Sequence, residues 1–169
     1  MQVEQLTYRV REVAGLQRAV VNWRLMARAP EPRKGYSSAQ QAGLRYERKA
    51  LKLLYREVPG FIDHPIFDFK TRHRGELLCG RAIPDGIVVD ARRQLVTVYE
   101  IKLRHTERAW SQLGDFYLPI VLRAFPGLRV NLVEVCKWYD PDVRLAPAVE
   151  LLSSPGEEAS RGVFIWSGR

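Results

Sequence analysis

The chain has 169 residues, a formal net charge of +8 and a hydrophobic content of 46%. This length predicts one main domain, and the composition excludes a chain that is disordered throughout. The excess of Lys and Arg favours a polyanionic partner, most commonly nucleic acid, although a basic surface can also serve solubility alone. The N-terminus lacks the apolar stretch of a signal peptide, and no apolar run is long enough to span a bilayer. We therefore expect a soluble, cytoplasmic protein without a membrane partner.

The first 35 residues end in a break at residues 29–35, where two prolines and a glycine stop regular structure. Before the break, apolar residues recur at near-helical spacing and predict a helix. These are Val3, Leu6, Val10, Val13, Val20 and Val21. We expect residues 1–35 to form a helical arm, residues 36–138 the core domain, and residues 139–169 an extension packed on the core. The arm is also a candidate dimer element, which leaves a homo-oligomer open.

The next predicted element is a helix over residues 38–58, capped by Ser37 or Ser38 and ended by Pro59 and Gly60. Its apolar stripe has helical period and consists of Leu44, Ala50, Leu51, Leu54 and Val58. The remaining surface is basic and either contacts a phosphate backbone or faces solvent. As candidate DNA contacts we name Arg45, Arg48, Lys49 and Lys52.

The middle of the chain alternates between strand-like and helical patterns. Residues 61–75 look irregular, and their His and Arg side chains fit a DNA-contacting loop or a solvated one equally well. Residues 76–80 predict a strand, and residues 83–90 and 95–103 predict a hairpin closed by a turn at 91–94. A helix over residues 107–125, capped by Thr106, and a strand over 128–136 follow. A last short strand is expected at residues 163–166, and the order indicates an α/β fold with a mixed sheet.

Two carboxylates and a lysine are expected to meet at one end of this hairpin. Glu100 and Lys102 occupy alternate strand positions and so point to the same face. Asp85 opens the neighbouring strand, so pairing across the turn brings its carboxylate close to Glu100. Hard oxygen ligands suit Mg²⁺, with Mn²⁺ as a substitute, and such an ion polarises a phosphodiester and activates water. Because two carboxylates would not lower the pKa of a lysine, we favour an orienting or electrostatic role for Lys102 and leave a base role open.

The pair Pro84-Asp85 followed by Glu100-Ile101-Lys102 resembles the signature of the PD-(D/E)XK nuclease superfamily. The resemblance implies a restriction-endonuclease-like core, a mixed sheet flanked by helices in the order α-β-β-β-α-β, which the elements predicted over residues 38–136 reproduce. It also implies that Asp85, Glu100 and the main-chain carbonyl of Ile101 hold the metal, with Lys102 as the catalytic lysine.

Many superfamily members add a glutamate on the first helix, and Gly43-Leu44-Arg45-Tyr46-Glu47 is similar to that element. The resemblance makes Glu47 the fourth candidate for the metal and catalytic group. The alternative is that Glu47 forms ordinary ion pairs along a basic helix. Competitors for the same corner are Asp63, Asp68 and Glu76.

The RecB-like branch of the superfamily carries Gln and Tyr in a QxxxY pattern on the helix after the core lysine. Here Gln112 and Tyr117 are one residue further apart, which in an α-helix turns Tyr117 about 100° away from the expected face. We keep Gln112 as a candidate DNA contact. Arg104 and His105, just after Lys102, are further candidates, and for His105 a plain helix-flanking role is the alternative.

These features predict a metal-dependent deoxyribonuclease of phage-type or repair and recombination processing. An exonuclease and a structure-specific endonuclease, such as a Holliday-junction resolvase, both stay open, as does RNA as the substrate. The alternative of another class is a nucleic-acid-binding or assembly protein with an inactive nuclease fold. The cysteines, Cys79 and Cys136, form no metal-binding motif and are expected to be reduced thiols, with a single disulfide left open.

Overall fold

A computed structural model of the protein describes residues 16, 19–25, 35–73, 75–139, 149–154 and 157–168. Most of the predicted N-terminal helix lies outside these residues. In chain order the elements are β1 (Val20–Arg24), α1 (Ser38–Glu57), β2 (Ile62–Asp63), β3 (Ile66–His73), β4 (Glu76–Ala82), β5 (Gly86–Asp90), β6 (Leu95–Arg104), α2 (Glu107–Ser111), the π-helix η2 (Gln112–Tyr117), α3 (Leu118–Ala124), β7 (Arg129–Trp138), β8 (Val149–Ser154) and β9 (Glu157–Ile165).

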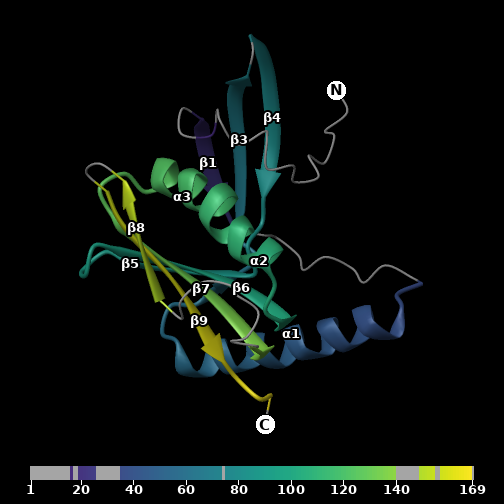
Figure 1. Ribbon diagram of the computed structural model, residues 1–169. Helices are drawn as coiled ribbons and strands as arrows, with labels where there is room; N and C mark the ends of the chain where they lie inside the picture. The colour runs from purple at the N-terminus through teal and green to yellow at the C-terminus, as the bar shows by residue number, and fades with distance from the viewer. Residues whose placement is uncertain are drawn as a thin grey trace.

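The described strands form two sheets (Figure 1). The larger has the order β2-β5-β6-β7-β9-β8, with β6, β7 and β9 parallel and the other pairs antiparallel. The smaller has the order β1-β3-β4 and is antiparallel. The fold is therefore mixed α/β, as the sequence predicts, and the parallel β6–β7 pair is connected through α2, η2 and α3.

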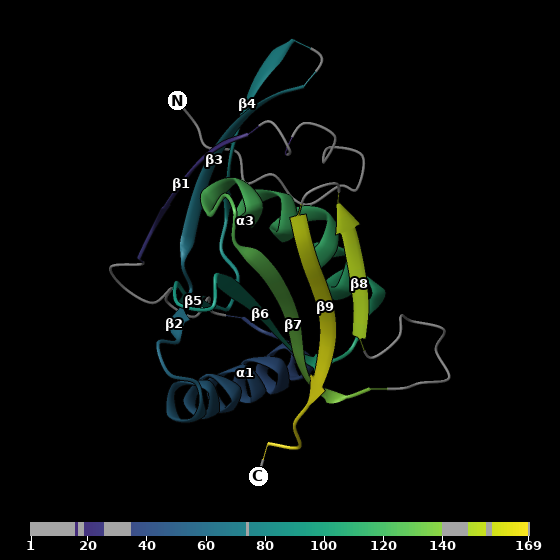
Figure 2. The ribbon, with the colours of Figure 1, turned by 90° about the vertical axis from the view of Figure 1, so that its left-hand side faces the viewer.

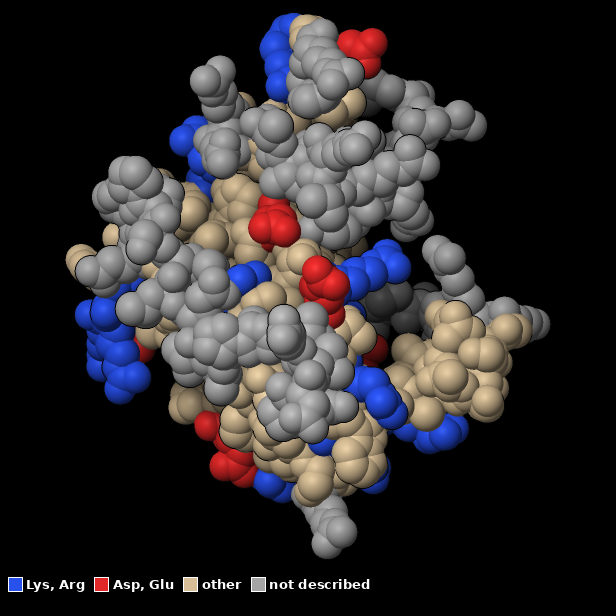
Figure 3. Space-filling view, in the orientation of Figure 1, with Lys and Arg blue, Asp and Glu red and all other residues tan. Residues whose placement is uncertain are grey.

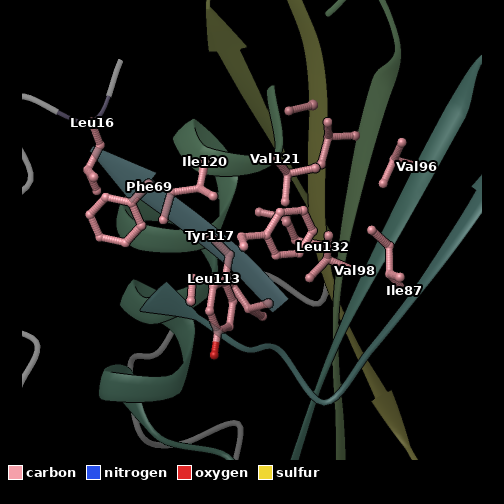
Figure 4. Close-up of a cluster of buried hydrophobic side chains, with 14 of the residues drawn as sticks. Leu16, Phe69, Ile87, Val96, Val98, Leu113, Tyr117, Ile120, Val121 and Leu132 are labelled. Carbon is pink, nitrogen blue, oxygen red and sulfur yellow. The ribbon is translucent and has the colours of Figure 1, made fainter. Parts of the chain in front are cut away.

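Helices cover both faces of the larger sheet (Figures 1 and 2). Tyr46, Ala50 and Leu54 of α1 pack with Ile101 and Val135 on one face. The other face, with the helices from α2 to α3 and the smaller sheet, encloses the main hydrophobic cluster (Figure 4). Alternation along β6 produces this division, because neighbouring side chains of a strand point to opposite faces.

Helix α1 confirms the predicted first helix of the core. Ser37 caps it in a capping box: its hydroxyl accepts from the main-chain nitrogen of Gln40, whose side chain accepts from the main-chain nitrogen of Ser37. The predicted hairpin is also confirmed as β5 and β6, and Asp90 holds its turn by accepting from the main-chain nitrogen of Arg93 at 3.0 Å.

Two predictions about local structure are wrong. Val20 and Val21, expected in the N-terminal helix, lie in strand β1, where the β-branched side chains suit pairing with β3. Residues 61–75, expected to be irregular, include β2 and the whole of β3, which pairs with β4. Phe67, Phe69 and Thr71 alternate as its buried face, a period of two that the many polar residues between them obscure.

The C-terminal residues take part in the larger sheet, because β9 pairs in parallel with β7 along Val130 to Cys136. The predicted last strand, residues 163–166, coincides with the end of β9, which begins earlier than expected. Cys79 and Cys136 are free thiols, in line with the expected reduced state. Within the described residues, no helix combines the length and apolarity that crossing a membrane would need.

Candidate metal centre

The candidate site begins where β5 and β6 stop pairing. The last pair of the ladder is Gly86 with Tyr99, and Asp85 precedes β5. The Asp85 carboxylate replaces the next ladder bond by accepting from the main-chain nitrogen of Ile101 at 2.5 Å. This bond fixes the carboxylate beside Glu100, which is the proximity that the hairpin predicts.

Glu100 and Lys102 point to the same face of β6 and form an ion pair. Glu100 is only 2% exposed. Burial raises the pKa of Glu100, although Lys102 opposes the shift. Burial also disfavours the charged form of Lys102, but Glu100 and Asp85 outweigh it and raise the pKa of Lys102 above its ordinary value. Lys102 is therefore an ammonium ion in this environment.

His64 is a member of the site that sequence reasoning missed. Its Nε2 lies 3.6 Å from Glu47 Oε1 and its Nδ1 lies 3.4 Å from Asp63 Oδ2. The Glu47 carboxylate raises the pKa of His64 to about 9, and Asp85 adds to that effect while burial opposes it. Glu47, which the sequence placed at this corner, does lie there.

The backbone of His64 is also unusual, with φ at +44°, a left-handed conformation that costs a non-glycine residue of order 1–3 kcal/mol. Its main-chain nitrogen donates to the carbonyl oxygen of Asp85 at 3.1 Å, so the turn after β2 is fastened to the segment before β5. Strain of this kind collects at functional sites, where the surrounding structure enforces it. Here it directs an imidazole toward two carboxylates.

Strand β2 escapes prediction because it has only two residues, too few for a periodic pattern. It is seated by Phe61, whose ring occupies the space beside Gly86. A Cβ at Gly86 would lie 2.3 Å from that ring, so any larger residue would displace the ring from its place beside the paired β2 and β5. The one signal in the sequence is that His64 follows Asp63. Strands β3 and β4 then lead the chain back to Pro84 and Asp85.

The donor set fits a divalent cation. One ligand atom from each of Glu47, His64 and Asp85 lies within 4.8 Å of the others, and all three side chains are partly buried. The buried Oε2 of Glu100 finds no hydrogen-bond partner among the described residues. Burial and Glu100 together hold the pKa of Asp85 well above its ordinary value. A cation between these groups would offset both the repulsion and the lost hydration.

Tyr117 reaches the site, which corrects the expectation that it lies about 100° from the required face. Gln112 and Tyr117 are the ends of a π-helical turn, in which main-chain bonds join residues five apart and bring both side chains to one face. Gln112 Nε2 donates to the Tyr117 hydroxyl at 2.7 Å, and that hydroxyl donates to the carbonyl oxygen of Ile83 at 3.2 Å. The nearby Tyr117 hydroxyl also lowers the pKa of Glu100, against the larger effect of burial.

Strand β9 supports this π-helical turn. Arg161 Nη1 donates to the carbonyl oxygen of Trp110 at 3.0 Å, and the guanidinium lies 4.2 Å from the centre of the Trp110 ring. A Cβ at Gly114 would lie 2.8 Å from Arg161 Nη1, so the glycine makes room for the arginine. In Figure 4 the Tyr117 ring lies in the hydrophobic cluster while its hydroxyl oxygen points away from it.

The candidate DNA contacts fall in different places. The four basic residues of α1 are exposed, on the helix that carries Glu47, and Arg104 is exposed at the end of β6. Gln112 is partly buried and bonds to Tyr117, so it supports the site from within. His105 is only 6% exposed and its Nδ1 lies 2.6 Å from Glu134 Oε2, so the expectation that it faces DNA is wrong.

Searches of family models, of curated proteins and of solved structures find no match to this chain.

Proposed function

We propose that this chain is a metal-dependent nuclease of the PD-(D/E)XK kind that hydrolyses phosphodiester bonds of DNA. One observation carries the proposal: Asp85, Glu100 and Lys102 meet at one end of a hairpin, beside Glu47 and His64, and a buried carboxylate oxygen there has no described partner. Three carboxylates, an imidazole and an ammonium in one corner of a basic protein suit the binding of a cation and a phosphate.

Glu47, His64, Asp85 and Glu100 are the residues that would hold the ion, with the carbonyl of Ile101 as a further candidate. A bound divalent ion would supply Lewis acidity toward the phosphodiester and lower the pKa of a coordinated water. His64 would bind the ion as the neutral imidazole, so binding would release the proton that its raised pKa retains. Its nitrogen would make the donor set a mixture of nitrogen and oxygen, which suits Mn²⁺ better than a purely oxygen set would. We accordingly propose Mn²⁺ or Mg²⁺, with Mn²⁺ bound more tightly.

Lys102 is proposed to orient the attacking water and to offset charge on the phosphate. Its raised pKa keeps the ammonium form, which donates hydrogen bonds and cannot accept a proton. The Tyr117 hydroxyl, fixed by Gln112 and Ile83, restrains Glu100 from the other side. Positioning of this kind contributes to catalysis because the reacting groups need no rearrangement.

The arrangement of elements supports the finer fold assignment, a restriction-endonuclease-like core. Helix α1 precedes the antiparallel β5–β6 hairpin, and the α2–α3 connection leads to β7, parallel to β6. The α-β-β-β-α-β order expected over residues 38–136 is extended here by β2, β3 and β4, of which β3 and β4 belong to the smaller sheet.

The test is cleavage of a substrate panel in Mn²⁺ or Mg²⁺: single strand, linear duplex, closed circle, flap, four-way junction and an RNA of the same sequence. We expect metal-dependent cutting of at least one DNA by the wild type and none by Glu100→Gln. The matched control is Asp90→Asn, because Asp90 ends strand β5 on the side away from Asp85. Binding of DNA without any cutting would overturn the proposal and indicate an inactive nuclease fold, whereas cutting of RNA alone would replace the substrate.

A further inference from the structure

A ribbon made of β3 and β4, with β1 paired along residues 66–70 of β3, is attached directly to the candidate metal centre. Strand β3 begins at Ile66, two residues after His64, and β4 ends at Ala82, three residues before Asp85. Both ends of the ribbon therefore start from candidate metal ligands. In Figures 1 and 2 the ribbon runs away from the larger sheet and extends beyond α3.

The two faces of the ribbon differ in chemistry. One face, with Phe67 and Phe69, packs into the hydrophobic cluster. On the other face the register places residue 70 opposite residue 79, and residue 72 opposite residue 77. Here Lys70 and Arg72 are exposed, as is Leu77 opposite Arg72, and Figure 3 shows a blue and a red side chain at the outer end of the ribbon.

Nearer the base of the ribbon, this solvent face holds an ion-pair group. Asp68 accepts from Arg81 Nε at 2.7 Å and from Arg24 Nε at 3.0 Å. Burial opposes ionisation of Asp68, but the two arginines outweigh it and lower its pKa. Among the described residues of this face, four cations stand with one carboxylate: Arg24, Lys70, Arg72 and Arg81 with Asp68.

The spacing fits a phosphate backbone that continues away from the site. At about 3.3 Å per residue, Lys70 lies about 10 Å, and Arg72 about 16 Å, from Phe67, the first residue of β3 that pairs with β4. These distances correspond to roughly three to five base pairs of duplex, since DNA carries one charge per about 1.7 Å of axis. Proteins that bind single strands add aromatic platforms for bases, and the described residues of this face include none.

We propose that the solvent face of the β3–β4 ribbon binds the phosphate backbone of the double-stranded DNA that flanks the cleaved bond, through Lys70 and Arg72. The inference deepens the proposed function and rests on it for the position of the cleaved bond. It predicts that the protein prefers a substrate with a duplex flank of about five base pairs or more on one side.

The experiment measures dissociation constants in EDTA, where no cutting occurs, for a duplex of about 20 base pairs and for one of its strands over a range of salt concentration. The variant is Lys70→Gln with Arg72→Gln. The matched control is Arg92→Gln with Arg93→Gln, which removes the same charge from the exposed turn between β5 and β6. Circular dichroism and thermal unfolding establish that both double variants fold, and Lys70→Arg with Arg72→Lys tests rescue by charge.

We expect the ribbon variant to bind duplex about tenfold more weakly and to lose about 1.8 from the slope of log K against log salt, two contacts at about 0.9 each. Single-strand binding and the control should change much less, and the charge-conserving variant should recover duplex binding. A ribbon variant with the slope of the control overturns the inference, and so does an equal loss for duplex and single strand. Because these measurements need no metal, failure of metal-dependent cutting refutes the proposed function separately.

Discussion

The protein contains two histidine–carboxylate clusters whose surroundings make them chemically different. His64 faces Glu47, Asp63 and Asp85, and its side chain is 14% exposed. His105 faces Glu134 alone, and both side chains are buried at 1% and 0% exposure. The first cluster lies on a strained turn and contains more carboxylates than cations. The second is a single buried ion pair beneath α2. A metal needs the excess of ligands that only the first provides.

The buried pair lies close to the metal centre. Glu134 is the register partner of Glu100 across β6 and β7, and burial raises the pKa of Glu134 while His105 opposes the shift. The His105 ring also meets Trp110 edge to face, 5.7 Å between ring centres. His105 and Glu134 therefore join the sheet to α2 beside the candidate site, although Glu134 Oε1 and His105 Nε2 find no hydrogen-bond partner among the described residues.

The largest expected effect comes from breaking the buried pair. His105→Ala should lower the free energy of unfolding by about 3–5 kcal/mol, because it leaves the Glu134 carboxylate buried without its partner. Chemical denaturation measures this loss. The double variant His105→Phe with Glu134→Met, which removes both charges, should recover most of it, and a double variant as unstable as the single one would show that packing rather than charge is responsible.

Removal of the site ammonium should affect activity and not folding. Lys102→Met should reduce kcat by about 10²–10³-fold, the usual cost of losing one preorganised charge-stabilising donor. Single-turnover cleavage in Mn²⁺ gives this value, and thermal unfolding checks the fold. Near wild-type cleavage by Lys102→Met would remove the lysine from the mechanism.

The metal centre should also make the metal-free protein less stable as pH rises. Burial and Glu100 raise the pKa of Asp85 in the folded state, so the native protein keeps a proton that the unfolded chain releases. Stability that depends on this proton is present below the unfolded pKa and is lost as pH rises toward the folded pKa. Asp85→Asn should therefore raise Tm in EDTA by more at about pH 8 than at about pH 5.

Asp85→Asn and the wild type should also respond differently to added metal. Mn²⁺ should stabilise the wild type and leave Asp85→Asn unchanged, because a ligand that binds only the folded state raises stability by mass action. An Asp85→Asn protein that is less stable than wild type in EDTA at both pH values would contradict the crowding of carboxylates at this site.

The smallest effect is expected at the π-helical turn. Tyr117→Phe removes the hydroxyl that bonds to Gln112 and Ile83, and should cost about 0.5–1.5 kcal/mol of stability with a modest loss of kcat. Urea denaturation and the cleavage assay give the two values. Wild-type values in both assays would place the hydroxyl outside the support of Glu100.

Much of the fold and the centre of the site could be predicted from sequence because they depend on local patterns. The Ser37 cap, the apolar stripe of α1 and the two strands of the hairpin each follow from spacing alone, and Glu100 and Lys102 share a face because strands alternate. His64 could not be found in this way. Its position depends on a two-residue strand and on Phe61 packing over Gly86, which is tertiary structure.

The predictions for the positions of Tyr117 and His105 are wrong for related reasons. An extra residue between Gln112 and Tyr117 predicts opposite faces in an α-helix, but a π-helical turn supported by Arg161, distant in sequence, restores the pairing. His105 follows Lys102 closely and looked exposed, yet its partner Glu134 comes from a strand 29 residues away. The positions of Tyr117 and His105 both depend on tertiary packing, in which β7 and β9 lie beside β6 and the helices.

We propose that Glu47, His64 and Asp85, which lie within reach of one ion, bind a divalent cation together with the adjacent Glu100. Calorimetric titration of Mn²⁺ into the wild type, Asp85→Asn and His64→Asn tests it most directly, and asparagine suits the left-handed backbone at position 64. We predict saturable binding to the wild type, no measurable binding to Asp85→Asn and at least about tenfold weaker binding to His64→Asn. Wild-type affinity in Asp85→Asn, or no binding by the wild type, would contradict the account.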